Sequence, residues 1–162
     1  MQLRGLLVLY FATLVITPSC AIQCAQSAIS TACALKNNAN LRFASAHVSG
    51  EKDKGFAAKN IQDMCNGNGA YTSNYCKDCK GKLIPETSVC ISAKVLDYLA
   101  ELAKNGSVTV NEIAGGCHMC TSLHYKGRAV DLDTRRKTEY RALCKKWGGD
   151  APNEASHTHC EF

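Results

Sequence analysis

The sequence lacks internal repeats and low-complexity tracts, and beyond residue 21 it has no apolar run long enough to cross a membrane. It also lacks a basic stripe interleaved with aromatic residues, because its 19 lysines and arginines are scattered apart from a cluster at 135–137. We therefore expect no nucleic-acid partner. The net charge of +5 is a mild basic bias, which is compatible with attraction to an anionic surface such as a bacterial wall.

Residues 1–21 have the features of a secretory signal peptide. Arg4 precedes an apolar run over 6–16, and Pro18 leads into the small residues Ser19 and Ala21. The run is short for a membrane span, which disfavours the alternative of a retained N-terminal anchor. We expect a secreted, extracellular protein with no membrane association once this segment is removed.

Ten of the eleven cysteines follow this segment. A dense, even set behind a signal peptide is typical of disulfide-bonded proteins in an oxidising compartment. Five bridges are possible, each adding about 2–4 kcal/mol to the free energy of unfolding, but the spacing does not give their connectivity. Two Cys-x-x-Cys pairs, starting at Cys76 and Cys117, would also suit a zinc ribbon, which the oxidising compartment disfavours.

Apolar periodicity and turn residues predict an α+β fold. Ser92 is a natural N-cap for the clearest helix, over 92–104. We also predict helices over 25–35, over 56–64 and from a Thr134 cap to 147, loops over 37–54, 65–85 and 114–122, and strands over 108–113, 128–132 and 156–162. Short connections indicate a small antiparallel sheet with flanking helices. We divide the chain into a cysteine-rich N-terminal region, 22–90, and a domain over 91–162 that carries the chemistry.

The strongest chemical signal lies in two segments, residues 122–131 and 157–159. Alternation along the predicted 128–132 strand turns Asp131 to one face and its apolar neighbours to the other. A turn at Gly127 returns His124 to Asp131, while the two histidines at 157 and 159 project to one face. Two histidines and one carboxylate, with a fourth position open for water, are typical of a catalytic Zn²⁺ site.

Residues 122–131 read Ser-Leu-His-Tyr-Lys-Gly-Arg-Ala-Val-Asp. This stretch matches the Ser-x-His-x-x-Gly-x-Ala-x-Asp zinc motif of the M15 family of D-alanyl-D-alanine peptidases. Together with Ser-His-Thr-His-Cys at 156–160, it also resembles the signalling domain of Hedgehog proteins, which share that fold. The resemblance covers about residues 92–162 and implies a Hedgehog/DD-peptidase-like fold around one zinc ion.

The resemblance implies that His124, Asp131 and His159 are the zinc ligands. In the His-x-His version of the family the second histidine binds the metal, and His157 then stabilises charge on the reacting carbonyl. The dipeptidase branch has a Glu-x-x-His pattern that would make His157 the ligand instead, and this two-residue alternative stays open.

Glu154 is the general base that the resemblance implies under either choice of ligand, and Glu112 is a second candidate. Ser122, Arg128 and Glu112 are candidates for substrate contacts or for hydrogen bonds that orient the ligands. In many family members an arginine in Ser-Gly-Tyr-Arg anchors a substrate carboxylate, but residues 111–116 here are Asn-Glu-Ile-Ala-Gly-Gly. Carboxypeptidase specificity is therefore disfavoured, while endopeptidase and dipeptidase action stay open.

The function that follows is that of a secreted, monomeric zinc metallopeptidase. Its substrates would be peptides, in particular peptidoglycan stem peptides or cross-bridges. The alternative is a catalytically inactive, Hedgehog-like module that keeps zinc for structure and serves extracellular interactions.

Overall fold

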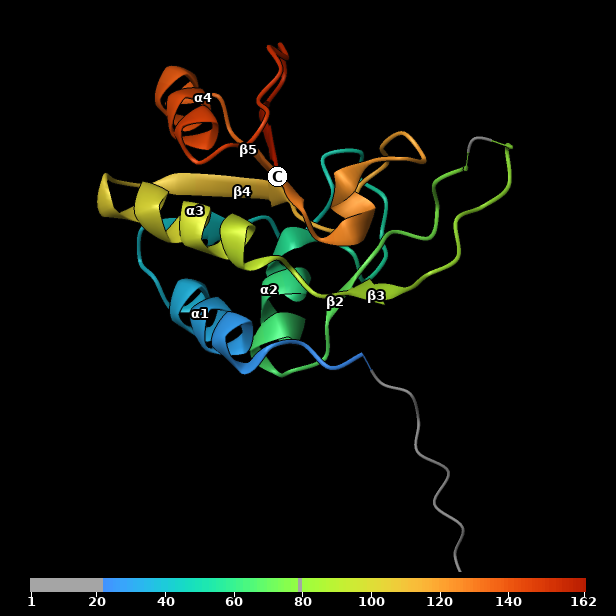
Figure 1. Cartoon of the computed structure of the whole chain (residues 1–162). Helices are drawn as coiled ribbons and strands as arrows, with labels where there is room; N and C mark the ends of the chain where they lie inside the picture. Colours follow the sequence, from blue (N-terminus) through green and yellow to red (C-terminus); the bar gives the residue numbers. More distant parts are fainter. Residues whose placement is uncertain (1–21, 79) are drawn as a thin grey trace, which may run out of the picture.

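The computed structural model describes residues 22–78 and 80–162 (Figure 1). The predicted signal peptide, 1–21, and Cys79 lie outside these residues. Among the described helices, none combines the length and the apolar character needed to cross a bilayer.

A four-stranded sheet carries the predicted site strands. Its order is β1 (Leu41–Phe43), β4 (Val108–Glu112), β5 (Ala129–Leu132) and β6 (Thr158–Glu161). Neighbouring strands among β4, β5 and β6 are antiparallel, as predicted, but β1 pairs with β4 in parallel. The predicted antiparallel sheet therefore gains one parallel pair at β1, and the prediction of a loop over all of 37–54 is wrong. A strand of three residues is too short to show the alternating pattern that identifies strands in a sequence.

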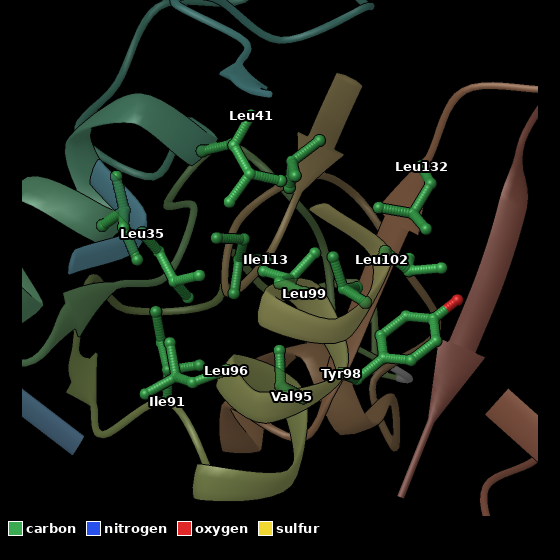
Figure 2. Close-up of a cluster of buried hydrophobic side chains, with 14 of the residues drawn as sticks. Leu35, Leu41, Ile91, Val95, Leu96, Tyr98, Leu99, Leu102, Ile113 and Leu132 are labelled. Carbon is green, nitrogen blue, oxygen red and sulfur yellow. The ribbon is translucent and has the colours of Figure 1, made fainter. Parts of the chain in front are cut away.

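Helix α3 (Ala93–Lys104) packs its apolar stripe against this sheet, as Figure 2 shows. Ser92 is its N-cap as predicted, because the Ser92 hydroxyl accepts a hydrogen bond from the backbone N–H of Val95. Ile113 and Leu132 face this stripe and are fully buried. The fully buried Tyr98 donates its hydroxyl proton to the backbone carbonyl of Tyr140.

The N-terminal region joins the same hydrophobic core. Helices α1 (Gln26–Lys36) and α2 (Ala57–Cys65) lie side by side (Figure 1), close to their predicted ranges. A short antiparallel pair, β2 (Ala70–Tyr71) and β3 (Ser88–Val89), follows within and just after the stretch predicted as loop. Buried side chains from Cys24 to Cys160 form one continuous cluster. Residues 22–90 therefore pack into the core of the chain that carries the site.

Helix α4 (Lys137–Lys146) begins later than the Thr134 cap predicted. Its N-cap is Arg136, which makes no side-chain cap hydrogen bond. Asp133 explains the difference, because its carboxylate accepts from the backbone N–H of Arg135 and holds the preceding residues in a turn. Tyr140 and other apolar side chains of α4 then face the core.

Disulfides connect the helices, loops and strands. The described pairs are Cys24–Cys90, Cys33–Cys65, Cys76–Cys117 and Cys144–Cys160, and Cys120 is also disulfide-bonded. The Cys76–Cys117 bond takes one cysteine from each Cys-x-x-Cys pair, which rules out the zinc-ribbon alternative. The Cys144–Cys160 bond ties α4 to β6, on the face of that strand opposite the predicted metal ligands.

Candidate metal centre

A short 3₁₀ turn, η1 (Leu123–Lys126), positions His124. The hydroxyl of Ser122 accepts from the backbone N–H of His124 and begins the turn. Gly127 ends it with a φ of +65°, a conformation that other L-residues rarely adopt. A Cβ at Gly127 would lie 2.3 Å from the carbonyl oxygen of Cys90. Both the backbone angle and the lack of space therefore require glycine at this position of the motif.

The ring of His124 has a defined orientation. Its Nδ1 lies within hydrogen-bond distance of the backbone carbonyl oxygen of Ile113, which can only accept. Nδ1 therefore carries a proton and donates, and Nε2 faces Asp131 and His159 in the site. This is the usual way in which a protein orients a metal-binding imidazole.

Strand register brings the other two ligands to the same face of the sheet. Asp131 on β5 pairs with Glu112 on β4 and with His159 on β6. Residues that pair directly across antiparallel strands project to the same side of a sheet. A single row across three strands thus holds Glu112, Asp131 and His159 together.

Three donor atoms form what we call the ligand triangle: His124 Nε2, Asp131 Oδ1 and His159 Nδ1. His124 Nε2 lies 3.3 Å from Asp131 Oδ1 and 3.3 Å from His159 Nδ1, and the remaining side is 2.9 Å. Tetrahedral zinc with bonds of about 2.0–2.1 Å holds its ligand atoms about 3.3–3.4 Å apart. The three side chains are buried, with residue exposures of 0, 4 and 9 %. The spacing and the donor types both fit one metal ion.

His157 and Glu154 lie directly beside the triangle. His157 Nε2 is 3.4 Å from Asp131 Oδ1 and 2.6 Å from Glu154 Oε2. Asp131, His157 and His159 could themselves hold a metal ion. Both candidates for the third ligand, His157 and His159, therefore lie close enough to the site to bind the metal. His159 forms the tighter contact with Asp131, at 2.9 Å, and its Nε2 donates to Glu161 at 3.1 Å.

The charge pattern of the metal-free site also suits a cation. Burial acts to raise the pKa of Asp131, but hydrogen bonds from His124, His157 and His159 outweigh it and hold that pKa well below its usual range. Burial acts to lower the pKa of His159, while hydrogen bonds to Asp131 and Glu161 raise it to about 9. Binding a metal must displace protons from such histidines, so the apparent affinity rises with pH.

His118 is a component of the site to which the sequence assigned no metal role. Its ring stacks on His124 with centroids 3.8 Å apart, and its Nε2 lies 3.0 Å from the carbonyl oxygen of Gly115. His118, His124 and Asp131 are a further set that could hold a metal ion. Cys117 and Cys120 flank His118 closely in the sequence, and only the folded chain shows that its ring lies beside His124.

His47, for which the sequence predicted no role, forms a buried side-chain hydrogen bond with Glu112 of β4. His47 Nδ1 lies 2.8 Å from Glu112 Oε1, and its Nε2 lies 2.7 Å from Asp53 Oδ1. Burial acts to lower the pKa of His47, but hydrogen bonds to these two carboxylates raise it to about 9. His47 and Glu112 are 65 positions apart in the sequence, so no local sequence pattern predicts this contact.

The structure brings most of the predicted site residues together but leaves Arg128 exposed, with its side chain outside the walls of the cavities beside the triangle. Ser122 orients His124 through the backbone, as one of its two predicted roles requires.

Comparisons with protein-family models, with curated proteins and with solved structures found no match to this chain. The geometry of the site is therefore the basis for what it can do.

Proposed function

We propose that this protein is a secreted zinc metallopeptidase of the M15 type. The observation that carries the proposal is the buried ligand triangle with the Glu154–His157 pair directly beside it. The disulfides support an oxidising, extracellular setting. The ten-residue motif at 122–131 supports the family.

Zinc fits the donor atoms of this site. Two imidazole nitrogens and one carboxylate oxygen are the ligand set of catalytic zinc, and water or substrate takes the fourth position. His124 Nε2, Asp131 Oδ1 and His159 Nδ1 would hold the ion. A bound zinc ion supplies Lewis acidity, which activates water and polarises a carbonyl group.

Glu154 and His157 would do the acid–base work. The side chain of Glu154 is about 38 % exposed, so its carboxylate can accept a proton from water and pass it to the departing amine. His157 is a hydrogen-bond donor next to Asp131, and its pKa is raised by its hydrogen bond to that carboxylate. A protonated imidazole there would stabilise negative charge on the carbonyl oxygen during hydrolysis.

We infer that the substrates are peptides and favour peptidoglycan stem peptides or cross-bridges. The motif supports this choice, because the M15 peptidases that it resembles act on such peptides. The mild positive charge of the chain would favour approach to an anionic wall.

The test begins with protein exported through an oxidising compartment. Metal analysis should give one zinc per chain, and the purified protein should release amino groups from at least one peptidoglycan type. His124→Ala should abolish both zinc retention and release, whereas Glu154→Gln should retain zinc and lose release. Glu101→Gln is the matched control, because Glu101 forms an exposed ion pair with Lys104 on α3 and should change neither.

An inactive, Hedgehog-like zinc-binding module is the second candidate. It is favoured by the walls of the cavities beside the triangle, which in the described chain contain no arginine or lysine to anchor a substrate carboxylate. Full zinc occupancy with no amine release from several wall types would decide for this module. Less than one zinc per chain would refute both candidates.

A further inference from the structure

Two cavities adjoin the ligand triangle, and His118 and His157 line both of them. The β4-side cavity has Asn111 and Glu112 of β4 in its wall. The β6-side cavity has Glu161 of β6 in its wall, together with the segment that precedes η1. Asp131 of the ligand triangle lines the β4-side cavity and His159 lines the β6-side cavity, so the triangle lies between the two.

The sheet places these cavities on opposite sides of the metal centre. β5 lies between β4 and β6, and Glu112, Asp131 and His159 form one row across the three strands. Asp131, in the middle of this row, belongs to the ligand triangle. A ligand that occupies both cavities must therefore cross β5 and pass over the triangle.

The outer wall of each cavity carries an exposed apolar side chain. Val48 is 83 % exposed and lines the β4-side cavity, and Met119 is 80 % exposed and lines the β6-side cavity. Only two other large apolar side chains of the described chain, Ile22 and Leu83, are exposed. An extended peptide that follows the cavities would contact Val48 on one side of the metal and Met119 on the other.

The charges along this path disfavour a bound carboxylate. The walls contain the carboxylates of Glu112, Glu154 and Glu161, and no lysine or arginine among the described residues lines either cavity. The chain as a whole carries a net charge of +5, so this lack of cations is local. A peptide with its free C-terminus beside the cleaved bond would find no lysine or arginine to pair with.

We propose that the substrate crosses the sheet from β4 to β6 and continues on both sides of the cleaved bond, so that the protein is an endopeptidase. The residues that flank this bond are neutral or cationic. This inference rests on the proposed zinc peptidase function and specifies its substrate class. One water is consumed: the amide C–N bond breaks, the carbonyl carbon gains the oxygen, and the nitrogen leaves as an amine.

The test uses peptides that share one central sequence, derived from a bond that the protein cleaves in peptidoglycan. One form is acetylated and amidated at its ends and extends three residues on each side. Others end in a free carboxylate or a free amine one residue from the bond. The blocked form should be cleaved with the highest kcat/KM, and aspartate next to the bond should lower kcat/KM relative to lysine.

Variants of the two exposed side chains test the two-sided path. Val48→Ala should lower kcat/KM several-fold only for peptides that extend over the β4 side, and Met119→Ala only for those that extend over the β6 side. Leu83→Ala is the matched control, since Leu83 is exposed but lines neither cavity. Fluorescence anisotropy of a labelled, blocked peptide with zinc-loaded Glu154→Gln protein measures the same losses without turnover.

The possible outcomes separate this inference from the proposed function. Cleavage confined to peptides with a free terminus next to the bond would overturn the endopeptidase inference and leave the zinc peptidase intact. Losses that do not depend on the side of extension would overturn the two-sided path. If zinc-loaded protein neither cleaves nor binds a peptide of any form, the proposed function itself fails.

Discussion

The imidazoles of His118 and His124 stack face to face, with their planes inclined by only 4°. Burial, followed by the neighbouring charge of His124, lowers the pKa of His118 to about 4, so its ring is neutral near pH 7. A neutral ring in this place packs flat against the imidazole of His124 and limits the orientations that this candidate metal ligand can adopt. The stack gives a role to a histidine that the sequence left without one.

Replacing His118 separates this packing role from direct metal binding. His118→Phe preserves a stacked ring, and zinc affinity should stay within about threefold of that of the unmodified protein. His118→Ala removes the stacked ring, and zinc affinity should fall at least about tenfold, as it does when groups that orient ligands are lost. Competition titration with a chromophoric chelator measures both. A tenfold loss in His118→Phe as well would instead make His118 a ligand.

The contact of His47 with Glu112 and Asp53 should make stability depend on pH. The pKa of His47 is raised from 6.5 to about 9 in the folded protein, so the folded state binds the additional proton between these values. Its stabilising effect is fully present below about pH 6.5 and is lost as pH rises through 9. The loss is on the order of 3 kcal/mol, because each pKa unit corresponds to 1.36 kcal/mol.

Urea unfolding at pH 6 and at pH 9.5 measures this effect. His47→Gln keeps a polar side chain of similar size but does not titrate, so its free energy of unfolding should change less between the two pH values. An equal decrease in both proteins would assign the pH dependence to other groups.

Two glycines with similar backbone angles should respond differently to alanine. Gly127 has a φ of +65° and no room for a methyl group, because the carbonyl oxygen of Cys90 would lie 2.3 Å away. Gly148 has a φ of +78° and open space around the same position. Gly148→Ala should cost about 1 kcal/mol, the usual penalty for a left-handed alanine. Gly127→Ala should cost more and should displace His124.

Thermal unfolding and zinc titration together test this comparison. A Gly127→Ala protein that matches Gly148→Ala in both measurements would mean that the turn before β5 can shift without affecting the site.

The Cys144–Cys160 bond should matter for the metal as well as for the fold. It closes a loop with a sequence separation of 16, so its loss through paired serine substitutions should lower the free energy of unfolding by about 3 kcal/mol. Because Cys160 adjoins His159 on β6, zinc affinity should fall too. The Cys33–Cys65 bond is the control: its separation of 32 predicts a loss of about 4 kcal/mol, but it joins α1 to α2.

Chemical denaturation and zinc titration of the two paired-serine proteins separate these effects. Unchanged zinc affinity without Cys144–Cys160 would show that strand pairing alone holds His159 in place.

Local patterns predicted much of the fold and indicated His124, Asp131 and His159 as candidate metal ligands, which the fold brings together. The α3 stripe and the Ser92 cap are complete within a dozen residues, and the alternation around Asp131 determines which face it occupies. The missed features depend on contacts between distant residues. β1 is identified by its pairing with β4, and the roles of His47 and His118 depend on rings and carboxylates that only the folded chain brings together.

The three residues of β1 pair with the edge of β4 that faces away from β5. A fragment that began at residue 91 would keep the whole 122–131 motif but would expose the edge of β4 over residues 108–110, which pair with β1 in the full chain. Such an edge is a template for pairing between chains, and therefore for aggregation. The cysteine-rich region, 22–90, thus also protects this edge from pairing with other chains. Attempts to produce residues 91–162 alone should yield insoluble material.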